Sequence, residues 1–186
     1  RGRNGITVAT VVPLRSRYML LSSLSLTTFA TVVPLRPRLP TAAPGTALLH
    51  TRGGCRLFLD TAVISEWEAL LPLGMFHGVT TNPTLLERAG EQCSVQRCGA
   101  LAQQAFSLGA SEFMLQTWGS TAEEMIETGV ALSRVDPGRI VVKVPITMGG
   151  TTAAAGLTAR GVRVCLTACY AKQQALVAGS VGAEYS

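Results

Sequence analysis

The segment "RIVVKVPITMGGTTAAAGLTARGVRVCLT", residues 139–167, decides the fold class. It opens with a run of β-branched residues, 139–144, which predicts a strand. An alanine-rich stretch follows, typical of a helix, and we expect Thr151 or Thr152 to cap it. A second apolar run, 162–167, predicts another strand. Strand, helix and strand with short connections indicate parallel strands joined by a right-handed crossover.

The same alternation extends over the chain from residue 56 onward. Apolar runs predict further strands at 56–60, 78–82 and 112–116, and the start of one more at 183–185. Helical spacing and start signals predict helices at 63–71, from Pro83 onward, at 120–134 behind a Ser120–Glu123 capping box, and near 170–179. The alternation predicts an α/β fold with a parallel sheet.

Two architectures fit this alternation, an open doubly wound sheet and a (β/α)8 TIM barrel. The open sheet usually has a glycine-rich first turn, whereas the first turn here reads "LDTAVIS", residues 59–65. Neither G-x-G-x-x-G nor a P-loop occurs, which favours the barrel. A barrel needs eight strands and typically about 250 residues. We therefore expect a TIM-barrel-type fold that is truncated after about five βα units.

Residues 1–54 differ in composition from residues 55–186. They contain seven arginines and no Asp or Glu, whereas 55–186 contain nine basic and eleven acidic residues. An Arg-, Ser- and Ala-rich segment without acidic residues is typical of a transit peptide. We therefore expect the protein to be located in a plastid or a mitochondrion, and the alternative location is the cytoplasm. The stretch "ATVVPLRSR" at 9–17 returns as "ATVVPLRPR" at 30–38, and a Pro/Gly-rich linker follows at 36–54. We interpret 1–54 as a disordered targeting segment and linker, and 55–186 as the N-terminal part of the barrel.

The composition also excludes several classes of function. The basic character lies in the first 54 residues, so we expect no nucleic-acid binding by residues 55–186. Serine and threonine dilute the uncharged stretch 18–35, so we expect no membrane span. The five cysteines are loosely spaced and only two histidines exist. We therefore expect reduced thiols and no metal site.

Polar side chains stand where the five predicted strands end. In barrel enzymes the chemistry lies at this end of the strands. Each residue alone would be interpreted as a helix cap, but five strands in succession indicate a shared site. The residues, in strand order, are Asp60, then Thr80, Thr81 and Asn82, then Gln116, then Lys143 with Thr147 beyond it, and finally Thr167.

Lys143 interrupts the most strand-like run of a chain in which 14 of 16 basic residues are arginines. Strand side chains alternate, so Lys143 shares a face with Val141 and lies opposite Val142 and Val144. Burial there would lower the pKa of the ammonium group and leave a neutral amine. A neutral amine attacks ketones to form a Schiff base, which arginine cannot do. The alternative is a lysine with a buried stem and a head that reaches solvent.

Four of these stretches together resemble the transaldolase family of class I aldolases. They are "LFLDTA" at 57–62, "GVTTNPTLL" at 78–86, "IVVKVPIT" at 140–147 and the T-A-x-Y…Q-A spacing at 167–175. The resemblance is strongest to the small branch that includes fructose-6-phosphate aldolase, and it covers residues 57–185.

The resemblance implies a (β/α)8 barrel with Lys143 as the Schiff-base lysine. It implies that Asp60 assists proton transfer and contacts substrate hydroxyls together with Asn82 and its neighbour Thr81. It also implies that Gln116 and Thr167 hold the catalytic water. The implied reaction belongs to carbohydrate (pentose phosphate) metabolism: a dihydroxyacetone unit of a ketose phosphate is transferred or cleaved, without metal or organic cofactor.

The partners so implied are small-molecule sugar phosphates, with a possible homo-oligomer in a full-length form. The family's phosphate-binding residues belong to the part of the fold that would follow Ser186. The sequence leaves both transaldolase and aldolase activity open. A truncated, catalytically inactive homologue and a Schiff-base barrel enzyme for another carbonyl substrate are the alternatives.

Overall fold

The computed structural model describes residues 8–11 and 56–186. The strands are β1 (Val8–Val11), β2 (Arg56–Asp60), β3 (Gly78–Thr80), β4 (Glu112–Gln116), β5 (Ile140–Pro145) and β6 (Val164–Thr167). The helices are α1 (Ile64–Leu70), α2 (Pro83–Arg88), α3 (Val95–Ser107), α4 (Ala122–Ser133), α5 (Met148–Thr158) and α6 (Lys172–Ser180), and a 3-10 turn, η1 (Leu71–Leu73), extends α1. Each of the five strands predicted between 56 and 167 is therefore present.

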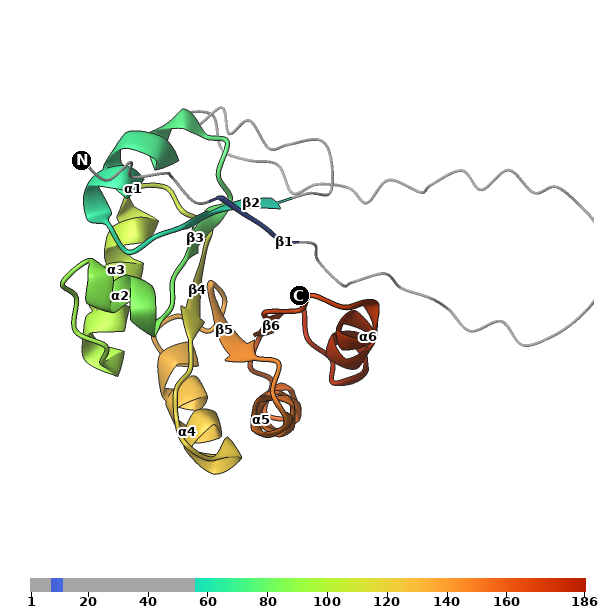
Figure 1. Ribbon diagram of the computed structural model, residues 1–186. Coiled ribbons are helices and arrows are strands. Elements are labelled where there is room, and N and C mark those ends of the chain that lie inside the picture. Colours follow the sequence, from blue (N-terminus) through green and yellow to red (C-terminus); the bar gives the residue numbers. More distant parts are fainter. Residues whose placement is uncertain (1–7, 12–55) are drawn as a thin grey trace, which may run out of the picture. The chain divides into compact units, whose positions relative to one another are not determined.

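The order of the strands confirms the barrel class. Strands β2 to β6 are parallel, and each pairs with the strand that follows it in the chain (Figure 1). A doubly wound sheet reverses its order part-way, whereas a (β/α)8 barrel adds every strand on the same side. The described residues thus contain five parallel strands wound as in a (β/α)8 barrel.

The two faces of the sheet carry separate apolar clusters. On the helix-covered face, residues such as Leu59 and Val142 are buried against the helices, and the Trp67 ring of α1 meets Phe113 edge-on at 5.6 Å. Because strand side chains alternate, the residues between them form the other cluster. That inner cluster consists of Phe58, Met114, Val141, Cys165 and Tyr185. Tyr185 also bridges Cys165 in parallel, as expected for the start of a further strand.

Strand β1 lies within the segment that the sequence assigns to targeting and linker. It pairs antiparallel with β2, with Val8 opposite Leu59 and Val11 opposite Arg56. The other residues of 1–54 lie outside the described part of the chain, and so does the expected transit peptide. The boundary at residue 54 stays a prediction. In the ranges 8–11 and 56–186, no helix is both long enough and apolar enough to cross a membrane.

Three local predictions need correction. The capping box of α4 uses Thr121 and Glu124 rather than Ser120 and Glu123. Helix α5 begins after Thr147, whose hydroxyl accepts from the Gly150 N–H at 3.0 Å, and neither Thr151 nor Thr152 caps it. The sequence interpretation also omitted α3, a helix of 13 residues between α2 and β4.

Candidate active site

The register of the sheet brings the predicted strand-end residues to one edge. Asp60, Gln116 and Thr167 are the last residues of β2, β4 and β6. Lys143 pairs with Gln116 on one side and with Cys165 on the other. Asp60 pairs with Thr80. The structure therefore places these side chains at the carboxyl ends of neighbouring strands, as the sequence predicts.

Lys143 is buried, with 7% of its surface exposed. Its Nζ donates a hydrogen bond to Thr80 Oγ1 at 2.7 Å and lies 3.9 Å from Asp60 Oδ1. Below it on the same face lie the apolar side chains of the inner cluster, including Val141 on its own strand. The alternative of a lysine head in open solvent does not fit this burial. The amine is held by one hydroxyl within reach of one carboxylate.

Burial shifts both ionisable groups toward their neutral forms. It lowers the pKa of Lys143, and the nearby charge of Asp60 only partly opposes this. Burial likewise raises the pKa of Asp60, and the attraction of Lys143 opposes it. At 3.9 Å the pair is too long for a hydrogen bond, so the attraction does not compensate for lost hydration. The site therefore favours the free amine, which is the nucleophilic form of lysine.

The hydroxyl groups of Thr80 and Thr81 differ in their contacts. Thr80, not Thr81, contacts Lys143. Thr81 directly follows the last residue of β3. It is 1% exposed, and its hydroxyl has no hydrogen-bond partner among the described residues. The substrate contact predicted for Thr81 stays a prediction, whereas the hydrogen bond between Thr80 and Lys143 was not predicted.

Asn82 has hydrogen-bond donors available for a substrate, whereas Asp60 has an acceptor available. Asn82 caps α2, because its Oδ1 accepts from the Leu85 N–H at 3.0 Å, and its amide N–H groups are left to donate. Asp60 Oδ1 is buried and lacks a hydrogen bond within the described ranges. A buried carboxylate oxygen without a donor is costly, so this atom is suited to accept from a hydroxyl or a water.

Gln116 and Thr167 are half-buried at the same edge, and no hydrogen bond joins either side chain to Lys143 in the described part of the chain. Thr167 is followed by Ala168, whose φ of +65° lies in the left-handed region. Non-glycine residues held there concentrate at functional sites. Among residues 56–186 no cluster of three His, Cys, Asp or Glu side chains is arranged to hold a metal ion.

Comparison with known proteins agrees with this geometry. The family model described as Transaldolase/Fructose-6-phosphate aldolase matches residues 57–186. The chain belongs to this family. It is 34% identical over 130 residues to a probable transaldolase of Moorella thermoacetica and 35% identical over 130 residues to one of Dictyoglomus turgidum. Each match covers 70% of this chain and 58% of the relative.

The chain therefore spans little more than half the length of the curated transaldolases that it matches. A probable transaldolase of Thermus thermophilus, 34% identical over 133 residues, shows the same extent, 69% of this chain and 59% of the relative.

A second polar cluster of this transaldolase-family chain was not predicted from the sequence. It lies at the amino ends of the strands, opposite Lys143, around the buried carboxylate of Glu112. Glu112 accepts from Arg163 at 2.6 Å, Arg56 at 3.2 Å and the Tyr185 hydroxyl at 2.8 Å, and His77 Nε2 lies 3.4 Å away. These donors lower the pKa of Glu112 to about 2 despite burial. We call Glu112, Arg56, Arg163, Tyr185 and His77 the Glu112 cluster.

Proposed function

We propose that the protein is a Schiff-base enzyme that transfers or cleaves a dihydroxyacetone unit of a ketose phosphate. The observation that carries the proposal is the buried Lys143 amine, held by Thr80 and close to Asp60. Membership of the transaldolase/fructose-6-phosphate aldolase family supports the same chemistry. We place the protein in pentose phosphate metabolism only because it belongs to that family.

The first steps use Lys143. Its neutral amine attacks the ketose carbonyl carbon, and the resulting carbinolamine loses water to give an iminium ion. The hydrogen bond to Thr80 fixes Nζ, which lowers the entropic cost of reaching the attack geometry. Gln116 and Thr167 hold the water that leaves and later returns.

Bond cleavage then needs a base. The iminium cation beside Asp60 favours its carboxylate form, because an opposite charge lowers the pKa of a carboxyl group. The Asp60 carboxylate, with Oδ1 free to accept, takes the proton from the C4 hydroxyl while the C3–C4 electron pair moves toward the iminium nitrogen. An aldehyde leaves, and a dihydroxyacetone enamine remains on Lys143. The enamine adds to a second aldehyde in a transferase, or is protonated and hydrolysed in an aldolase. A positioned base of this kind contributes about 10²–10⁴-fold to the rate.

Asn82 completes the proposed substrate contacts. Its Oδ1 is used by the helix cap, so its amide N–H groups donate to substrate hydroxyls. The substrate's phosphate is assigned no partner among the residues of this chain.

Reductive trapping tests the proposal. The chain is incubated with fructose 6-phosphate and sodium borohydride, and the peptides are analysed by mass spectrometry. We expect the reduced adduct on Lys143, its loss in Lys143→Ala, and its retention in Lys172→Ala. Lys172 is a matched control because it is the other lysine of the chain and is exposed. No adduct would favour the inactive homologue, and an adduct on Lys172 would refute the assignment.

We further propose that residues 1–54 direct the protein to a plastid or a mitochondrion. The support is compositional: seven arginines and no acidic residue. Fusion of residues 1–54 to a fluorescent protein tests this by microscopy. A diffuse cytoplasmic signal would contradict the proposal.

A further inference from the structure

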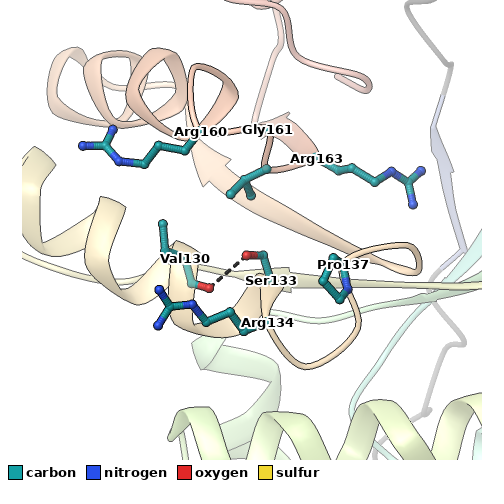
Figure 2. A pocket seen from close by; sticks show the side chains of 8 residues that line it. Val130, Ser133, Arg134, Pro137, Arg160, Gly161 and Arg163 are labelled. Carbon is teal, nitrogen blue, oxygen red and sulfur yellow. Dashed lines mark hydrogen bonds between the residues drawn. The ribbon is translucent and has the colours of Figure 1, made fainter.

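A cavity of about 490 Å³ lies near the amino ends of β5 and β6 (Figure 2). It lies between the last turn of α4 and the turn that joins α5 to β6. Its walls combine basic and apolar side chains. The lining residues are Val130, Ser133, Arg134, Pro137, Arg160, Gly161, Val162 and Arg163.

The cavity is separate from the candidate active site. Pro137 precedes β5 and Arg163 precedes β6, so the cavity lies at the amino ends of these strands. Lys143 lies toward their carboxyl ends, beside Gln116. Neither the Schiff-base mechanism nor the predicted substrate contacts use any residue of the cavity wall.

Two exposed arginines at the rim of the cavity lack a neutralising carboxylate. Arg134 extends from the end of α4 and Arg160 from the end of α5, toward the same end of the cavity (Figure 2). Within the described residues, no Asp or Glu oxygen lies within 4.0 Å of either group. Arg160 donates to its own helix at Gly156 O, at 2.6 Å, which uses one of its five N–H donors.

Arg163 does not contribute in the same way. Its guanidinium points away from the other two and binds Glu184 through two hydrogen bonds of 2.8 Å and Glu112 through one of 2.6 Å (Figure 2). The Ser133 hydroxyl also has a partner, because it donates to Val130 O at 2.9 Å. The donors left for a ligand therefore belong to Arg134 and Arg160.

We propose that this cavity binds the phosphate group of a small organic molecule through Arg134 and Arg160. Guanidinium forks match phosphate oxygens in geometry and charge. The volume lies in the range of small-molecule sites. Val130, Pro137 and Val162 provide apolar walls for the carbon part of such a molecule.

Helix ends offer a competing explanation of these arginines. Helices α4 and α5 both end at the cavity, and the carbonyl ends of helices attract cations. That role places one arginine at each helix end but requires no ligand. Arg88, in the last turn of α2, is a suitable control, since it also lies near the carbonyl end of a helix but does not line the cavity.

Titration of the full chain with phenyl phosphate, followed by amide NMR at constant ionic strength, tests the proposal. We expect saturable shifts of the Gly161 and Val162 amides, and no such shifts with phenol. Arg134→Gln and Arg160→Gln should each weaken binding about tenfold, because each removes charged hydrogen bonds. Arg88→Gln should bind as the wild type does.

Absence of saturable shifts, equal shifts with phenol, or unchanged affinity in both cavity variants would overturn the proposal. The two arginines would then serve the helix ends alone. All variants replace surface side chains, and far-UV circular dichroism verifies that they fold. Because Lys143 lies at the other end of the strands, this result is independent of the trapping experiment.

Discussion

Replacing Glu112 by glutamine should destabilise the fold and leave the lysine site intact. The donors of the Glu112 cluster lower the pKa of this carboxyl from 4.5 to about 2. A pKa lowered by roughly 2.5 corresponds to at most about 3.5 kcal/mol, since a change of one in pKa is worth about 1.4 kcal/mol. Partial screening by solvent reduces this, so we expect a loss of about 2 kcal/mol at pH 7.

The sign of the pH dependence follows from the lowered pKa. The carboxylate contributes its full stabilisation above pH 4.5, and this contribution is lost as the pH falls toward 2. The free energy of unfolding, measured with urea from pH 7 to pH 3, should therefore fall more steeply in the wild type than in Glu112→Gln. As a control, Glu91→Gln removes the surface pair with Arg97 and should cost less than about 1 kcal/mol. Equal stability of Glu112→Gln and the wild type at pH 7 would refute the reasoning.

Three further predictions concern the lysine edge of the sheet. Because burial lowers the pKa of Lys143, the rate of borohydride trapping should rise with pH and level off well below 10.5, and a rate still rising at pH 10.5 would contradict this. Thr80→Val removes the hydroxyl that accepts from Lys143 Nζ and should slow trapping about fivefold, corresponding to about 1 kcal/mol. Thr80→Ser keeps a hydroxyl and should trap at the wild-type rate. A valine variant that traps as fast as the wild type would show that the hydrogen bond has no role. Ala168→Gly removes the strain of a side chain at a left-handed φ and should raise the free energy of unfolding, measured with urea, by about 0.5–1 kcal/mol. A lower free energy of unfolding in this variant would mean that the conformation of Ala168 is not strained.

The strands were predictable because their pattern is local. Each is a short apolar run, and the parallel order follows from the helices between them. The missed helix α3 has its buried residues Cys98, Leu101, Ala102, Ala105 and Phe106 at helical spacing. Alanine and cysteine carry little hydrophobic contrast, which weakened this pattern.

The cap errors have physical reasons too. Ser120 and Thr121 each stand three residues before a glutamate, so the sequence does not choose between them. Gly149 and Gly150 are poor helix formers, which suggested a later start for α5. In the structure a side chain at Gly150 would overlap the Pro145 carbonyl oxygen, so the glycine serves close packing within the first turn.

The lysine edge was predictable and the Glu112 cluster was not. Asp60, Gln116, Lys143 and Thr167 follow from a rule about strand ends. The partners of Glu112 come from distant parts of the chain and lie at the amino ends of the strands, where no local sequence pattern predicts them. Long-range pairings of this kind depend on the fold, which must be known before the pairs can be named.

The composition of the Glu112 cluster bears on how the protein folds during synthesis. Arg163 follows Glu112 by 51 residues and Tyr185 follows it by 73. A ribosome that has released only the first four parallel strands therefore exposes a nascent chain whose central carboxylate lacks two of its donors. We expect such an intermediate to remain loose at this end until Tyr185 emerges, which delays cooperative closure of the inner face until both Arg163 and Tyr185 have left the ribosome.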